Sequence, residues 1–335
     1  MAIMRQRWVI AFLVGGAVNL GAADTGPVGT SPDPSVSAPI SAAEPVSDAD
    51  EPTEILIEAP EPRYVAPTRR DRIGRIWAPV YINDKGPFRM VLDTGASRSG
   101  IIAHVAADLG LVPDASAPVR LQGATGSQVV PTVLVQTLLV GDVLIKGSKL
   151  PILRDALGGA EGILGNEGLV DRRVYIDFRH DLIIISRSHD QRASAGFMTI
   201  PFSLEHGRLL VALVQLGHVR AKAIIDTGSQ STVGNMALRN ALVSRRSREQ
   251  PTVDELQGVT AEIEQGEGHS APPIEFGPFE IHTLRMTFAD AHIFKVWRLT
   301  NEPALLIGMD ALGTLDTLII DYRRHELQLR MREGS

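Results

Sequence analysis

Two aspartates in matching contexts are the residues of this 335-residue chain best suited to chemistry. Asp93 and Asp226 each begin an Asp-Thr-Gly triplet, and the triplets follow the apolar runs Met90–Leu92 and Ala223–Ile225. Two carboxyl groups brought close together cannot both ionise cheaply, so one keeps a proton while the other is charged. Such a pair can take a proton from water and give one to a carbonyl oxygen, which is acid–base chemistry suited to amide hydrolysis.

The residues after each aspartate fit this role. Gly95 and Gly228 have no Cβ, so backbone amides can come close to a carboxylate. Thr94 and Thr227 each carry a hydroxyl that we expect to bond the backbone of the opposite turn and lock the two turns together.

The two turns differ at one position. Ser229 follows the second triplet, whereas Ala96 follows the first. A hydroxyl that donates to a carboxylate stabilises its charge. We therefore expect Asp226 to be the ionised partner and Asp93 the protonated one.

The triplets are part of an internal repeat, in which four landmarks recur in order at offsets of 133, 135, 143 and 144 residues. A single triplet is typical of a capped turn with a structural aspartate, and it is the repeat that favours one shared site. The paired segments are Asp93–Gly95 with Asp226–Gly228, Leu121–Thr125 with Leu256–Thr260, Ile163–Gly165 with Leu306–Gly308, and Tyr175–Arg179 with Ile319–Arg323.

Composition limits the classes of function. Hydrophobic residues make up 44% of the chain and charged residues 21%, which is ordinary for a globular protein. The net charge of −6 gives no reason to expect nucleic acid as a partner. The chain has no cysteine, which excludes disulfides and thiol nucleophiles, and its nine histidines show no metal-ligand spacing. No metal and no cofactor are predicted.

The first 70 residues predict a targeting segment and a linker. Residues 1–23 run from basic to apolar to small side chains, which is typical of a signal peptide. An uncleaved anchor is the alternative, although the apolar stretch is short for a membrane span. We expect a periplasmic or secreted protein, tethered to the membrane only if this segment is kept. Residues 24–70 are rich in Pro, Ala and Ser and predict a disordered linker.

Residues 71–195 and 196–335 predict two similar, mainly β lobes, because short strands with Gly and Pro breaks fill both. In each lobe a hairpin is expected to deliver the aspartate, and a short helix to follow it. The expected elements are strands over Trp77–Ile82 and Phe88–Leu92 with a helix over Ile101–Leu109, then strands over Leu209–Leu216 and Lys222–Ile225 with a helix over Met236–Val243.

From about Arg72 to Arg330 the chain resembles the aspartic protease superfamily of pepsins and retropepsins. The resemblance is carried by the two Asp-Thr-Gly motifs and by the hydrophobic-hydrophobic-Gly elements Ile163–Gly165 and Leu306–Gly308. Each lobe resembles a bacterial retropepsin-like domain, and their fusion is the pepsin arrangement. The resemblance implies an all-β, bilobal pepsin-like acid protease fold made of two duplicated retropepsin-like β-barrel lobes, with Asp93 and Asp226 as the catalytic dyad.

The resemblance also implies an activity, that of a monomeric aspartic endopeptidase that cleaves extended polypeptides without metal or cofactor. Pepsins carry a tyrosine on a single flap, but the tip Gln122–Gly126 has none, and Gln257–Thr260 offers a second tip. We expect both lobes to project a flap. A catalytically silent peptide-binding protein of the same fold is the alternative, because a fold alone does not establish activity. The flap residues expected to contact substrate are Gly123, Ala124, Thr125 and Gly258.

Overall fold

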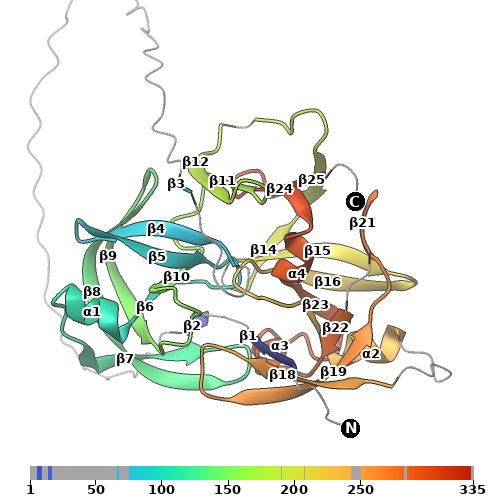
Figure 1. Cartoon of the computed structure of the whole chain (residues 1–335), viewed down its shortest axis with the longest axis horizontal. Coiled ribbons are helices and arrows are strands. Elements are labelled where there is room, and N and C mark those ends of the chain that lie inside the picture. Colours follow the sequence, from blue (N-terminus) through green and yellow to red (C-terminus); the bar gives the residue numbers. More distant parts are fainter. Residues whose placement is uncertain are drawn as a thin grey trace, which may run out of the picture. The chain divides into compact units, whose positions relative to one another are not determined.

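The computed structural model describes residues 6–9, 14–16, 66–67, 75–189, 191–206, 208–242, 250–282 and 285–332. The structure is mostly β, with 54% strand and 9% helix, which confirms the predicted all-β fold. The strands of the described residues form sheets of eight, eleven and six strands (Figure 1). The predicted linker over residues 24–70 lies outside the described residues, except for the short strand β3 (Ala66–Pro67).

The eight-stranded sheet contains a closed barrel. Its order is β2-β7-β8-β4-β5-β10-β6-β9, and an additional pairing of β8 with β9 closes the six strands from β8 to β9. The strands are β2 (Val14–Gly16), β4 (Trp77–Ile82), β5 (Lys85–Leu92), β6 (Gly100–Ile102), β7 (Asp114–Gln122), β8 (Ser127–Val140), β9 (Val143–Leu153) and β10 (Gly162–Leu164).

Strand β5 carries the first aspartate into the interior. In β4, buried and half-exposed side chains alternate, which is the pattern of a strand with one face on the core. Asn83 and Asp84 both have positive φ and make a tight turn into β5. The last three residues of β5, Met90–Leu92, are fully buried, and β10 runs parallel to them with Leu164 opposite Leu92.

The eleven-stranded sheet delivers the second aspartate in the same way. Strands β15 and β16 form a hairpin, and β23 runs parallel to the end of β16 with Ile307 opposite Ile225. This pairing agrees with the repeat read from the sequence, while the duplication of whole lobes stays a prediction. The strands are β1 (Gln6–Val9), β14 (Ser203–Glu205), β15 (Leu209–Leu216), β16 (Val219–Ile225), β17 (Val233–Gly234), β18 (Thr252–Gln257), β19 (Ile263–Ser270), β20 (Ile274–Phe276), β21 (Phe279–Ile281), β22 (Arg285–Phe288) and β23 (Ala304–Ile307).

The six-stranded sheet takes strands from both predicted lobes, in the order β13-β25-β24-β11-β12-β3. Its central pair, β11 and β24, places Tyr175 opposite Ile319, so one pair of repeated segments lies side by side. The predicted boundary at residue 195 falls between two strands of this sheet. The strands not yet given are β11 (Arg172–Asp177), β12 (Leu182–Arg187), β13 (Met198–Pro201), β24 (Leu315–Asp321) and β25 (Glu326–Met331).

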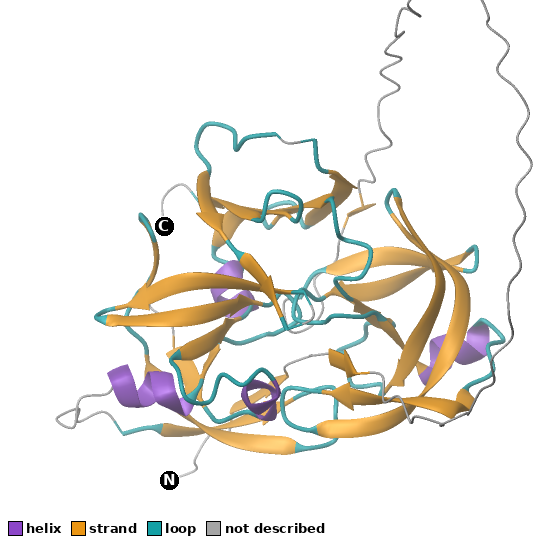
Figure 2. Ribbon diagram, turned by 180° about the vertical axis from the view of Figure 1, so that it is seen from behind, coloured by secondary structure: helices purple, strands orange, loops and turns teal. Residues whose placement is uncertain are grey.

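The described helices are short (Figure 2). The predicted helix over Ile101–Leu109 begins later, because its first two residues belong to β6 and extend the barrel. Among the described residues, none of the helices is both long and apolar enough to span a membrane. The helices are α1 (Ala103–Asp108), α2 (Met236–Leu242), α3 (His292–Val296) and α4 (Met309–Leu312).

Candidate active site

The two Asp-Thr-Gly turns meet in the interior. Asp93 N–H donates to Leu164 O at 2.9 Å, and Asp226 N–H donates to Ile307 O at 3.0 Å, so each turn is tied to the parallel strand beside it. Both aspartates are fully buried. A Cβ on Gly228 would overlap the Asp93 carboxyl group, which shows that the first carboxyl lies against the second turn and needs glycine there.

The two threonines bind across the turns, as expected from the sequence. Thr94 Oγ1 donates to Ile225 O at 2.7 Å and accepts from Thr227 N–H at 3.0 Å. Thr227 Oγ1 donates to Leu92 O at 2.6 Å and accepts from Thr94 N–H at 3.2 Å. All four groups are buried, so the geometry of one turn fixes that of the other.

The two carboxylates receive different numbers of amide donors. Asp93 Oδ1 accepts from Gly95 N–H at 2.9 Å. Asp226 Oδ1 accepts from Gly228 N–H at 2.8 Å and also from Ser229 N–H at 3.2 Å. Oδ2 of each aspartate is buried and receives no hydrogen bond from the amides or hydroxyls of the described residues. These two atoms are therefore the ones available to share a proton and bind water.

The hydroxyl of Ser229 does not reach Asp226. It donates to Ser231 O at 2.8 Å instead, which corrects the expectation that it supports the charge of the carboxylate. The second donor to Asp226 is the Ser229 amide, because this turn continues for one more residue around the carboxylate.

The pKa values of the two carboxyls are raised unequally. Burial raises the pKa of Asp93 well above its ordinary value, and the charge of Asp226 and a hydrogen bond to it raise it further. Burial raises the pKa of Asp226 to about 7, while the Gly228 amide and the hydrogen bond from Asp93 hold it down. The higher pKa belongs to Asp93, so a proton shared by the pair favours Asp93, while the expected ionisation of Asp226 stays a prediction.

Three buried polar residues that the sequence did not single out support the turns. The Asn166 amide donates to Thr94 O at 2.8 Å, and its oxygen accepts from Tyr322 OH at 2.7 Å. Arg75 is fully buried, and its charge lowers the pKa of Asp93 against the effect of burial. Asn166 directly follows Gly165, the last residue of a repeated landmark, which is a signal that could have found it.

Two hairpin tips touch each other. The tip Gly123–Gly126 between β7 and β8 meets the tip Gly258–Glu262 between β18 and β19 (Figure 1). Thr125 Oγ1 donates to Glu262 O at 2.7 Å and accepts from Gly258 N–H at 3.2 Å. Four predicted flap residues, Gly123, Ala124, Thr125 and Gly258, thus come together in one contact, although their role as flaps stays a prediction.

Helix α3 holds the first tip. Ile293 N–H donates to Ala124 O at 3.2 Å, and His292 Nε2 lies 2.8 Å from Gln122 Oε1. Burial and then the charge of Lys295 lower the pKa of His292, which keeps the ring neutral at neutral pH. The contact therefore joins uncharged groups.

The edges of both hairpins are paired with the N-terminal part of the chain. β1 runs parallel to β18 with Val9 opposite Gln257, and β2 runs antiparallel to β7 with Val14 opposite Gln122. These edge strands therefore accept an extended chain through backbone hydrogen bonds.

The site supplies two carboxyl groups and fixed backbone amides. No group of three or more metal-ligating side chains occurs among the described residues. What the arrangement can do is hold one proton between two buried carboxyls and take another from water.

Comparison with known proteins agrees with this geometry. Residues 78–167 match the family model of the aspartyl proteases. The match includes Asp93 and ends two residues after Gly165, and it supports a place in the pepsin and retropepsin-like superfamily. No curated protein matches the chain.

Proposed function

From the premise that residues 78–167 are an aspartyl protease domain, we propose that this protein is an aspartic endopeptidase with Asp93 and Asp226 as its dyad. The observation that carries the proposal is the meeting of the two turns. Two buried carboxyls with unequally raised pKa values, each held by the amides of its own turn, are a general acid and a general base in one place.

The reaction follows from the protonation of the pair. Asp226 takes a proton from a water molecule as the water oxygen attacks the peptide carbonyl carbon. Asp93 gives its proton to the carbonyl oxygen, so no free oxyanion forms. The tetrahedral intermediate then breaks at the C–N bond, as Asp226 passes its proton to the leaving nitrogen and Asp93 recovers a proton from the hydroxyl that becomes the new carbonyl. The pair returns to its starting state.

The substrate is an extended polypeptide. The pairing of β1 with β18 and of β2 with β7 supports this, because it shows that these hairpin edges bind chain in the extended form. Removal of residues 1–23 as an export signal would release both edges to substrate. We accordingly propose that the mature enzyme acts in the periplasm or outside the cell as a monomer.

The test is cleavage of an unfolded protein by the purified full chain across pH 3–8, with cleavage sites read by mass spectrometry. We expect cleavage by the wild type and by the control Asp108→Asn, which changes an exposed aspartate of α1. Asp93→Asn and Asp226→Asn should each lower the rate at least about 1,000-fold, since each removes one half of the acid–base pair.

Cleavage that survives in either dyad variant would contradict the proposed mechanism. A wild type that binds unfolded protein without cutting it would favour a silent peptide-binding protein.

A further inference from the structure

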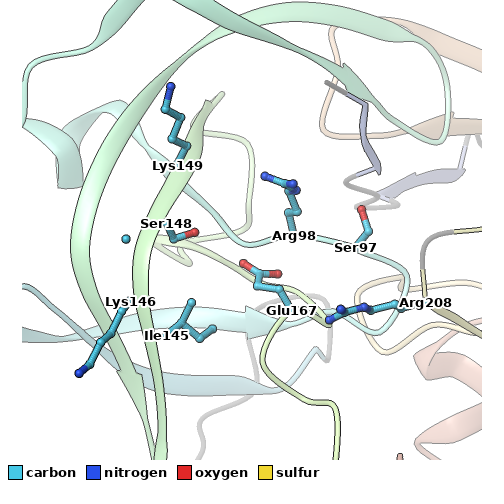
Figure 3. Close-up of a pocket in the computed structure, with 9 residues that line it drawn as sticks. Ser97, Arg98, Ile145, Lys146, Ser148, Lys149, Glu167 and Arg208 are labelled. Carbon is cyan, nitrogen blue, oxygen red and sulfur yellow. The ribbon is translucent and has the colours of Figure 1, made fainter. Parts of the chain in front are cut away.

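A basic cavity of about 640 Å³ lies beside the first catalytic turn. Figure 3 shows Arg98 and Arg208 on one side of it, with Lys149 on the strand opposite and the Glu167 carboxyl between. The remaining lining residues are Ser97, Ile145, Lys146, Gly147 and Ser148. Three cationic side chains, those of Arg98, Lys149 and Arg208, and one carboxyl group therefore line a single cavity, while the amine of Lys146 is directed away from them.

The cavity is anchored to the frame that holds Asp93. The backbone of Arg98 lies so close to Gly165 that a Cβ there would overlap it, and Gly165 follows the residue whose carbonyl binds the Asp93 amide. Asn166 donates to Thr94 O at 2.8 Å and to Arg208 O at 3.1 Å, which ties the second arginine to the same turn. Arg98 follows Asp93 by five residues, and five residues of chain span at most about 18 Å. An extended substrate covers the same distance with about five residues, so Arg98 lies within about five substrate residues of the scissile bond.

The cations of this cavity outnumber its carboxyl group. Arg98, Lys149 and Arg208 make no side-chain hydrogen bond or ion pair with the described residues. Glu167 Oε1 accepts from Ser99 N–H at 2.6 Å, and burial raises the pKa of this carboxyl, while the hydrogen bonds from Ser99 and the charge of Arg98 lower it. The cavity is thus positively charged and partly lined by polar groups.

We propose that this cavity is a specificity subsite that binds the carboxylate of an Asp or Glu side chain of the substrate. Guanidinium groups pair with carboxylates in fixed geometry, and two of them on one wall can hold both oxygens. This inference rests on the proposed function, because it names the substrate feature that the same site selects.

The subsite is confined to one side of the dyad. The second turn repeats the frame, with Gly308 against the backbone of Ser231 as Gly165 is against Arg98. Thr232 and Asp310 likewise repeat Ser99 and Glu167, with Thr232 N–H donating to Asp310 Oδ2 at 2.9 Å. The residue in the place of Arg98 is a serine, so the acidic residue is selected on only one side of the cleaved bond.

The repeat supplies a matched substitution, Arg98→Ser, which gives the first turn the residue of the second. Arg208→Gln removes the other guanidinium, and Arg220→Gln changes an exposed arginine of β16 as the control. Each full-length protein is given quenched octapeptide pools in which one position at a time is Glu or Gln, at low ionic strength. Cleavage rates are measured and cleavage sites are read by mass spectrometry.

We expect one position, within about five residues of the cleaved bond, at which the Glu pool is cut about tenfold faster than the Gln pool. Arg98→Ser and Arg208→Gln should each bring this ratio close to one, because each removes a guanidinium that pairs with the carboxylate. Arg220→Gln should keep the ratio. A ratio near one in the wild type, or one that persists in both arginine variants, overturns the subsite.

A wild type that cuts no pool contradicts the proposed function but not the subsite. In that case, binding of the same pools, carrying a fluorescent label, is measured by fluorescence anisotropy. The subsite is supported if the wild type binds the Glu pool more tightly than the Gln pool and Arg98→Ser abolishes this difference. Equal binding of both pools by the wild type overturns it. Inorganic phosphate is the last probe. Phosphate that binds the cavity while Glu and Gln pools behave alike assigns the cavity to a free anion and overturns the proposal.

Discussion

The hydroxyl of Thr94 and that of Thr227 each accept a hydrogen bond from the main-chain N–H of the other threonine. Each hydroxyl also donates to the carbonyl of the last residue of the strand that leads into the other turn. The two donations, 2.7 Å to Ile225 O and 2.6 Å to Leu92 O, end on the residues that directly precede the aspartates. The geometry of the two Asp-Thr-Gly turns is therefore set by bonds that neither turn can make alone.

The first prediction concerns this exchange. Thr94→Val leaves Ile225 O and Thr227 N–H buried without their partner, and each such group costs about 1–3 kcal/mol. We expect the free energy of unfolding, measured in urea, to fall by about 2–6 kcal/mol. Thr94→Ser keeps the hydroxyl and should lose under about 1 kcal/mol. Equal losses in both variants would mean that the methyl group, and not the exchange, matters.

The second prediction is the pH dependence of kcat/KM. Below the pKa of Asp226, about 7 in the closed structure, both carboxyls are protonated and the base is lost, so the rate falls as the pH is lowered. If the predicted flaps open to admit substrate and water, this pKa falls, because burial is its main cause. We expect an acid limb between about 4 and 7. A rate that keeps rising to pH 3 would contradict this protonation of the pair.

The third prediction separates the hydroxyl of Ser229 from its amide. Since the hydroxyl binds Ser231 O and the amide binds Asp226, Ser229→Ala keeps the donor to the carboxylate. We expect the acid limb of the pH–rate profile to move by less than about 0.3 pH units, and the stability to fall by about 1 kcal/mol. A shift of a full unit would restore the hydroxyl as the group that supports the charge.

The fourth prediction is a dependence of stability on pH. Folding raises the pKa of Asp93 above its ordinary value near 4. The free energy that the Asp93 carboxyl contributes to folding is therefore complete below about pH 4, and it is lost as the pH rises through the pKa of the folded protein. Asp93→Asn removes this loss. We expect it to raise Tm by about 4 °C at pH 8 and to leave Tm nearly unchanged at pH 3. A gain of the same size at both pH values would point to a cause other than charge.

The fifth prediction concerns the meeting of the hairpins. His292→Ala removes the bond between Nε2 and Gln122 Oε1 that holds the first tip to α3. Loss of about 1 kcal/mol should speed amide hydrogen exchange at residues 122–126 about fivefold. His282→Ala is the control, since its ring is exposed and pairs locally with Glu280. Unchanged exchange in His292→Ala would show that the backbone contacts alone close the tips.

Much of the local structure could be predicted from the sequence. The strand over Trp77–Ile82 is observed with the predicted bounds, because a short apolar run followed by turn residues is a strong local signal. The helix over Met236–Leu242 was also expected to within one residue. The start of the first helix was wrong, since Ile101 and Ile102 are drawn into the barrel by pairing with β9, a contact that no local pattern records.

The sequence by itself was enough to predict the two aspartates, the threonines and glycines that follow them, and the pairing of the repeated landmarks, because these depend on residue type and order. The tertiary structure alone decided which atoms support the charge of Asp226 and which buried residues, Arg75 among them, act on Asp93. It alone also placed Arg98, Arg208 and Lys149 around one cavity. These relations join residues far apart in the chain through burial and close approach, which only the folded backbone brings about.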